Sequence, residues 1–187
     1  YTQAITLKSD YVEAYSNLGV MLQELGRFDS AEISLRQAIT LNLGYAEAHS
    51  NLGITLKELG RLDEARTSYT RAITLKPDYA EAYNNLGITL QELGGSDKAA
   101  SSFTKAITLK SDFTEAIKNR WLLLFNEKKF ESALKDADAC SFKGAKESDL
   151  TTLYALGRME EISKRIDIKS QMDGENRSIA AFATFFA

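Results

Sequence analysis

The sequence predicts an all-α fold, a solenoid built from stacked helical hairpins. The tetrapeptide Ala-Ile-Thr-Leu occurs four times at an interval of 34 residues, beginning at Ala4, Ala38, Ala72 and Ala106. Between these positions apolar residues recur three and four places apart, which is the spacing of one face of an α-helix. A fixed period of this length is typical of a repeat that buries its apolar face by stacking on its neighbours. Function is then expected on an extended surface.

Three regular repeats are predicted over residues 12–113, and each predicts two antiparallel helices. In the first repeat, Leu18 and Leu22 mark the inner face of the first helix, and Leu35 marks that of the second. A glycine is expected to end each first helix, where a residue with positive φ is favoured: Gly26, Gly60 and Gly94. The aspartates three residues later are predicted N-caps of the second helices: Asp29, Asp63 and Asp97.

The starts of the first helices are predicted to carry capping boxes, in which an acidic pair satisfies the first N–H groups of a helix. An aspartate precedes a glutamate by three residues at Asp10 and Glu13, Asp78 and Glu81, and Asp112 and Glu115. Gly44 interrupts this pattern before Glu47.

Incomplete repeats are predicted on both sides of the regular array. Residues 1–11 match the end of a repeat and are assigned to the second half of an upstream one. Residues 114–140 form a degenerate fourth repeat, in which Trp121 stands where Gly19 stands in the first. Residues 141–187 are predicted to be a short, atypical helical C-terminal region.

The composition argues against several classes of function. The net charge of −3 gives no basic stripe for binding nucleic acid. No apolar run approaches the roughly 20 residues that span a membrane. Cys140 is the only cysteine, so no disulfide forms within the chain, and this fits a reducing compartment. We therefore expect a cytoplasmic protein that binds neither nucleic acid nor membrane.

The sequence offers little material for catalysis or for metal binding. His49 is the only histidine, and because it replaces Tyr15 and Tyr83 at the same place in the repeat, it is interpreted as a packed ring. Cys140 occupies the place of Ala106 and is interpreted as a small core residue. One histidine and one distant cysteine do not provide the usual zinc ligands. We expect a protein that is not an enzyme and has no cofactor and no metal.

The third repeat contains the run Ala-Glu-Ala-Tyr-Asn-Asn-Leu-Gly at Ala80–Gly87, followed by Leu90, Gly94, Ala99, Phe103 and Ala106. These residues resemble those of the tetratricopeptide repeat family. The resemblance covers about residues 1–113 and includes arrays of the type found in O-linked N-acetylglucosamine transferases. It implies a right-handed superhelix of helix pairs, whose first helices line a concave groove for extended peptides or partner helices.

One asparagine recurs on the first helix of every repeat, and a second polar row lies beside it. An amide both donates and accepts, so a regular row can pair with the N–H and C=O groups of an extended peptide whatever its sequence. The alternative is that asparagine before Leu-Gly is common in this family whatever the protein binds. The first row is Asn17, Asn51, Asn85 and Asn119, and the second is Ser16, Ser50, Asn84 and Lys118.

Recurrent glutamates complete the predicted groove. They tilt its potential towards negative values and favour a basic or neutral peptide. The alternative is that they serve helix starts and solvation. A basic clamp for a carboxylate, as in the chaperone-tail receptors of the family, is disfavoured because only Lys118 matches it in charge. The glutamates assigned to the groove are Glu24, Glu58 and Glu92, with Glu13, Glu47, Glu81 and Glu115 nearby.

These features support two hypotheses from different classes. The first is a non-catalytic protein–protein interaction scaffold that binds an extended peptide or a partner helix in the concave groove. The alternative is the recruiting arm of a larger enzyme, of glycosyltransferase, sulfotransferase or oxygenase type, whose catalytic domain is absent from this chain. A further possibility is self-association through the exposed ends of the array.

Overall fold

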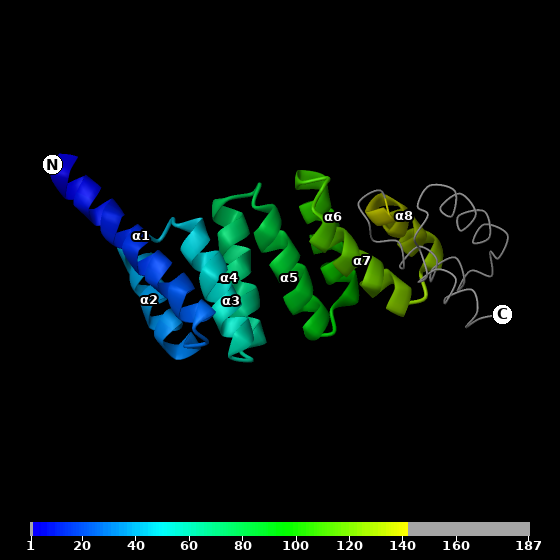
Figure 1. The fold of residues 1–187 in the computed structure, drawn as a ribbon, viewed down its shortest axis with the longest axis horizontal. Coiled ribbons are helices and arrows are strands. Elements are labelled where there is room, and N and C mark those ends of the chain that lie inside the picture. The colour runs from blue at the N-terminus through cyan, green and yellow to red at the C-terminus, as the bar shows by residue number, and fades with distance from the viewer. Residues whose placement is uncertain (1, 142–187) are drawn as a thin grey trace, which may run out of the picture. The chain divides into compact units, whose positions relative to one another are not determined.

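The computed structural model describes residues 2–141, which form eight α-helices and no strand (Figure 1). The all-α prediction is confirmed. By Cα positions the chain divides into two compact parts, Tyr1–Leu123 and Leu124–Ala187, and the division falls within the seventh helix. The C-terminal region predicted over residues 141–187 lies, from residue 142 on, outside the described residues, as does the side chain of Cys140. The helices are α1 Thr2–Glu24, α2 Phe28–Leu41, α3 Ala46–Glu58, α4 Leu62–Leu75, α5 Ala80–Glu92, α6 Ser96–Leu109, α7 Thr114–Asn126 and α8 Phe130–Ser141.

Helix pairs stack in the first compact part. The hairpins α1–α2, α3–α4 and α5–α6 pack internally, and α2 contacts α3 as α4 contacts α5. The first helices also contact one another, α1 with α3 and α3 with α5. Among these described helices no comparable contact joins α2 to α4 or α4 to α6. The first helices are therefore the more closely spaced row and lie on the inner side of the array.

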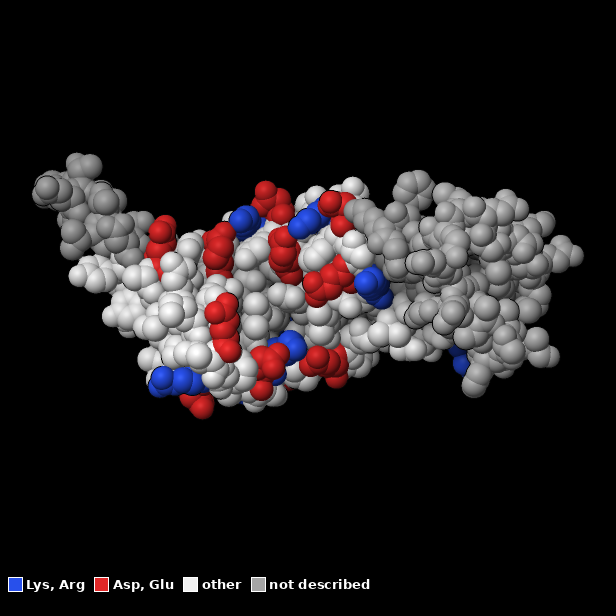
Figure 2. Space-filling model, in the orientation of Figure 1, with Lys and Arg blue, Asp and Glu red and all other residues white. Residues whose placement is uncertain are grey.

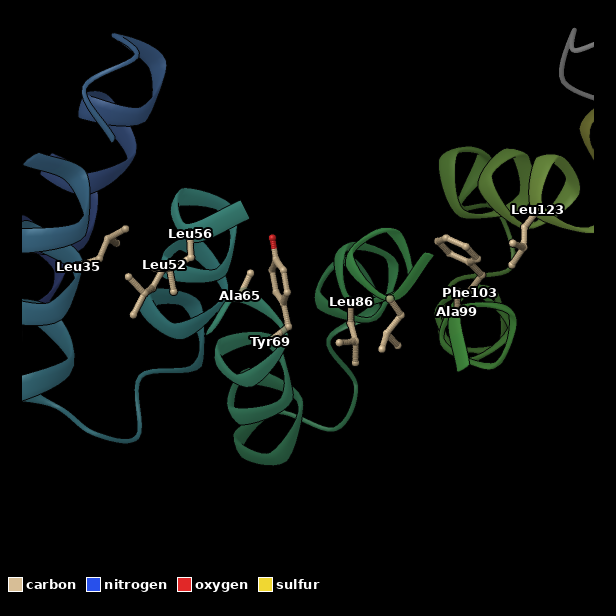
Figure 3. Close-up of a cluster of buried hydrophobic side chains, with 10 residues drawn as sticks. Leu35, Leu52, Leu56, Ala65, Tyr69, Leu86, Ala99, Phe103 and Leu123 are labelled. Atoms are coloured by element: carbon tan, nitrogen blue, oxygen red, sulfur yellow. The ribbon is translucent and has the colours of Figure 1, made fainter. Parts of the chain in front are cut away.

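The core of each hairpin depends on a glycine in the first helix facing a large side chain in the second. A Cβ added at Gly53 would lie 2.6 Å from the ring of Tyr69, too close to be accommodated without movement. Gly87 stands in the same relation to Phe103. Because the glycine has no side chain, the two backbones approach closely and the ring is fully buried. Figure 3 shows these side chains as parts of one continuous apolar cluster that runs from Leu35 to Leu123.

The three predicted glycine turns are confirmed. Gly26, Gly60 and Gly94 have φ values of 68°, 74° and 78°. At the end of α3, Gly60 N–H donates to the Lys57 carbonyl at 2.9 Å and Arg61 N–H donates to the Leu56 carbonyl at 2.8 Å. This pair of bonds is the Schellman motif, which satisfies carbonyl groups left without partners at a helix end.

The predicted aspartate N-caps of the second helices are wrong. The N-cap residues are Arg27, Arg61 and Gly95, and none makes a side-chain capping hydrogen bond. Because the residue after the glycine both completes the Schellman motif and precedes the next helix, that helix begins earlier than predicted. The aspartates consequently lie in its first turn, where a negative charge still interacts favourably with the helix dipole. They are Asp29, Asp63 and Asp97.

The predicted capping boxes are also wrong where the structure tests them. The N-cap of α5 is Tyr79, with no side-chain capping bond, so Asp78 lies one residue too early. Glu81 instead forms an ion pair with Lys110 at 3.2 Å. At the N-terminus α1 runs through both Asp10 and Glu13, so there is no helix start to cap there.

Candidate functional site

Each first helix in the regular array carries the same line of four surface residues. In α1 these are Glu13, Asn17, Val20 and Glu24, spaced four, three and four residues apart. At 3.6 residues per turn this spacing keeps them on one narrow face of the helix. All are exposed or half-buried, and we call the three lines together the first-helix stripe. The lines in α3 and α5 are Glu47, Asn51, Ile54 and Glu58, and Glu81, Asn85, Ile88 and Glu92.

The asparagines of the stripe reach an open surface. Asn17 is exposed, and Asn51, Asn85 and Asn119 are half-buried. Within the described residues no hydrogen-bond partner is present for the side-chain amides of Asn17, Asn51 and Asn85. Both the donor and the acceptor of these three amides are consequently available to a ligand.

The second predicted polar row does not line the surface, with the exception of Lys118. Ser16, Ser50 and Asn84 are buried, so their assignment to a groove is wrong. They lie one residue before the asparagines, which rotates them by about 100° around the helix, away from the open face. Ser16 lies beside Tyr45 and Ser50 beside Tyr79, where one repeat meets the next. Lys118 is exposed, as predicted.

The third repeat replaces this serine–tyrosine contact with a different one. Phe113 stands where Tyr45 and Tyr79 stand and has no hydroxyl. Asn84 Nδ2 instead donates to Glu115 Oε1 at 3.2 Å, and Asn119 Nδ2 donates to Asn84 Oδ1 at 3.0 Å. Asn119 is half-buried like Asn51 and Asn85, but its side-chain NH₂ group already donates within the protein, so it is less available than the other three asparagines. The simultaneous change from tyrosine to phenylalanine and from serine to asparagine is visible in the sequence, and it is the signal from which this link could have been predicted.

The acidic side chains of the stripe are only partly neutralised. Glu47 pairs with Lys76 at 2.9 Å, and this hydrogen bond lowers the pKa of the Glu47 carboxyl. At the other end of the stripe Lys57 lies 3.1 Å from Glu58 and 4.0 Å from Glu92. Glu24 has no ion-pair partner among the described residues. Figure 2 shows a face of the described array on which acidic side chains predominate over Lys and Arg.

His49 has a structural environment. Its Nε2 lies 3.2 Å from the Leu43 carbonyl oxygen, and burial lowers the pKa of the ring, which favours the neutral form. No group of three or more potential metal ligands occurs in the part of the chain that the structure describes. None of its described helices is both long enough and apolar enough to span a bilayer.

Comparison with known families identifies the repeats. Residues 12–45 and 80–113 match the family described as tetratricopeptide repeat, and residues 55–94 match a second family described as TPR repeat. No curated protein sequence is significantly similar to the chain.

Several solved structures share the fold. MamA is 26% identical, with a TM-score of 0.66 over 88% of this chain and 87% of its own. YrrB, described as a TPR protein with an unusual peptide-binding site, is 21% identical, with a TM-score of 0.69 over 98% of this chain and 96% of its own. The O-GlcNAc transferase of Thermobaculum terrenum, as its K341M mutant, is 23% identical, with a TM-score of 0.63 over 70% of this chain and 26% of its own.

Proposed function

The chain belongs to the tetratricopeptide repeat family, and on this premise we propose that it is a non-catalytic scaffold that binds an extended polypeptide along the first-helix stripe. The observation that carries the proposal is the repetition, at Asn17, Asn51 and Asn85, of a side-chain amide that has no hydrogen-bond partner among the described residues. A ligand that satisfies these amides gains hydrogen bonds that the free protein makes only with water.

Recognition of the main chain explains why the same residue type recurs in every repeat. The N–H and C=O groups of an extended peptide recur along its length whatever its side chains are, and an amide can pair with either group. The neighbouring aliphatic residues Val20, Ile54 and Ile88 are half-buried and offer apolar contact between the amides. This combination favours an extended segment over a compact ligand.

The charge of the stripe favours a neutral or basic segment. Glu24, Glu58 and Glu92 are exposed, and the one lysine that pairs with any of them among the described residues is Lys57, which contacts Glu58 and Glu92, so this side of the stripe keeps a negative potential. A lysine or arginine in the peptide gains from that potential, whereas an acidic peptide is repelled. Binding of a terminal carboxylate by a basic clamp is not favoured, because Lys118 is the one basic residue among those assigned to the groove.

Peptide titration tests whether the asparagine amides recognise the main chain of the peptide. A peptide selected from an immobilised library with the wild-type chain is titrated by calorimetry into the wild type and into the Asn51→Ala, Asn85→Ala double variant. We expect affinity to fall about 30-fold, because each removed amide costs about 1 kcal/mol. N-methylation of the peptide backbone should weaken binding more than alanine substitution of its side chains.

The matched control is Gln37→Ala, which removes an exposed amide from α2, outside the stripe. It should leave the affinity within twofold of wild type. Equal affinities for the double variant and the wild type would contradict the proposal. The alternative function, a recruiting arm of a larger enzyme, predicts the same groove, so this experiment tests the part that both hypotheses share.

A further inference from the structure

At two boundaries between repeats, a lysine ammonium group lies between a carboxylate and an aromatic ring. In the first of these, Lys76 Nζ lies 2.9 Å from Glu47 Oε1 and 4.7 Å from the centre of the Tyr79 ring. A carboxylate and the face of an aromatic ring both attract a cation. The side chain of Lys76 therefore links the start of α3 to the turn that precedes α5.

The same arrangement recurs one repeat later. Lys110 Nζ lies 3.2 Å from Glu81 Oε1 and 5.0 Å from the centre of the Phe113 ring. In both cases the lysine follows the glutamate by 29 residues and precedes the aromatic residue by three. Because one ring belongs to a tyrosine and the other to a phenylalanine, the arrangement needs an aromatic face and does not need a hydroxyl.

The boundary between the first and second repeats has the carboxylate and the ring without the lysine. The same spacing there gives Glu13, Asn42 and Tyr45. The backbone is unchanged, since the φ and ψ of Asn42, −143° and 98°, are close to the −135° and 87° of Lys76 and the −140° and 91° of Lys110. In all three turns the carbonyl of this residue accepts from the N–H of the aromatic residue, at 3.0–3.2 Å. The lysine is therefore missing because of one substitution inside the array.

Asn42 does not fill the place of the lysine ammonium group. Its side chain is shorter and uncharged, and its Oδ1 accepts from Gly44 N–H at 3.0 Å, within the same turn. Glu13 is exposed and has no ion-pair partner among the side chains that the structure describes. At this boundary the carboxylate therefore keeps the charge that a lysine neutralises at its counterparts, Glu47 and Glu81.

The pKa of the Tyr45 hydroxyl shows which charges lie near its ring. Burial raises this pKa, and the negative charges of Glu47 and Glu13 raise it further. At Tyr79 burial again raises the pKa of the hydroxyl, but there the charge of Lys76 acts in the opposite direction. Glu13 and Tyr45 are therefore near one another, as are the carboxylate and the ring that hold Lys76.

We infer that Glu13 and Tyr45 form a subsite for a lysine or arginine side chain of the polypeptide held along the first-helix stripe. The bound cation takes the place that Lys76 and Lys110 occupy at the next two boundaries. This inference rests on the proposed function, and Glu13 is itself a member of the stripe. Amides recognise a main chain in any register, whereas a single subsite for a basic side chain fixes which residue of the peptide lies on which repeat.

Library selection tests whether the subsite fixes the register. Randomised peptides of one length are selected on the immobilised wild type and, separately, on the Asn42→Lys variant, whose added lysine should occupy the subsite as Lys76 does one repeat later. We expect the wild type to enrich lysine or arginine at one position of the aligned peptides. The variant should still bind peptides but lose that preference. Ser111→Lys adds the same charge at another exposed turn, so it is the matched control and should keep the preference.

The outcomes separate the subsite from the proposed function. If all three chains enriched peptides without a fixed basic position, or if Asn42→Lys kept the wild-type preference, the subsite would be overturned and main-chain binding by the asparagines would stand. If no chain enriched any peptide, the proposed function would be overturned, and the subsite with it.

A double-mutant cycle on one enriched peptide measures the contact itself. The peptide is synthesised with lysine and with norleucine at the enriched position, and each form is titrated by calorimetry into the wild type and into Glu13→Gln. We expect Glu13→Gln to weaken binding of the lysine peptide about 5-fold, at the upper end of the range for exposed ion pairs. Binding of the norleucine peptide should not change. Equal losses for the two peptides would show that Glu13 does not act on the cation, and would overturn the subsite.

Discussion

A missing side chain at Gly53 and a large one at Tyr69 together set the distance between α3 and α4. The ring of Tyr69 fills the space that a Cβ at Gly53 would occupy, and this side chain is fully buried. Its hydroxyl oxygen is buried and has no hydrogen-bond partner in the described part of the chain, and burial raises the pKa of the phenol well above its ordinary value. In the next repeat Phe103 has the same place without a hydroxyl. The packing therefore requires the ring, whereas burial of the unpaired hydroxyl lowers the free energy of unfolding.

We expect Tyr69→Phe to raise the free energy of unfolding by about 1 kcal/mol, since it removes an unsatisfied polar group without removing the ring. Urea unfolding at pH 7 measures the change. The raised pKa also has a pH signature: the wild type loses stability as the pH rises above about 10, where tyrosine ionises in the unfolded chain and stays protonated in the fold. The Tyr69→Phe variant should lose less stability over the same pH range. Tyr83→Phe, at a half-buried position, is the control; a loss of stability in Tyr69→Phe would mean that the hydroxyl has a partner.

At the scale of the helix, the ends of the first helices could be predicted and the starts of the second helices could not. Positive φ strongly favours glycine, so Gly26, Gly60 and Gly94 mark the turns in the sequence itself. An aspartate, by contrast, suits either an N-cap or the first turn, and the choice depends on how many residues the preceding turn uses. The burial of the serines was not predicted for a similar reason. Helical periodicity shows which residues share a face of the helix, but the packing of the neighbouring repeat decides which face is buried.

The turn between α7 and α8 repeats the glycine geometry without the glycine. Lys128 has a φ of 60°, and Lys129 N–H donates to the Leu124 carbonyl at 2.9 Å, as in the other Schellman motifs. A side chain in this conformation costs about 1 kcal/mol relative to glycine. We therefore expect Lys128→Gly to raise the midpoint of thermal unfolding, with a gain of about 0.5–1 kcal/mol. Lys128→Ala keeps the strained conformation and should give no gain; equal stabilisation by both would assign the effect to the lysine charge.

At the scale of the whole array, the sequence period gave the fold class and the row of asparagines, because both depend on repetition alone. The role of each asparagine in that row could not be predicted in the same way. Within the described residues the side chains of Asn17, Asn51 and Asn85 have no hydrogen-bond partner, whereas Asn119 donates to Asn84 in the repeat boundary where Phe113 replaces tyrosine. The repeat pattern predicts which residue type recurs at a position, whereas the contacts with neighbouring residues decide whether its side chain is available to a ligand.

The charge of the stripe is a property of several repeats acting together, and it yields a prediction for binding. Glu58→Gln with Glu92→Gln removes two charges without changing side-chain shape, at positions exposed beside Lys57. For a peptide that carries lysine we expect a 3- to 10-fold loss of affinity, because exposed charge pairs contribute about 0.2–1 kcal/mol each. The affinity for a neutral peptide of the same length should not change, and the difference should disappear as salt screens the stripe. Calorimetry at two ionic strengths measures both effects.

Asp63→Asn with Asp97→Asn is the matched control, since it removes two exposed charges from the second helices, outside the stripe. It lowers the net negative charge of the chain by the same amount. If the control weakened the lysine peptide as much as the stripe variant did, the attraction would come from net charge and not from the ordered rows of glutamates. A selective loss in the stripe variant, together with the loss caused by removing the asparagines, would assign main-chain recognition to the amides and preference for basic side chains to the glutamates beside them.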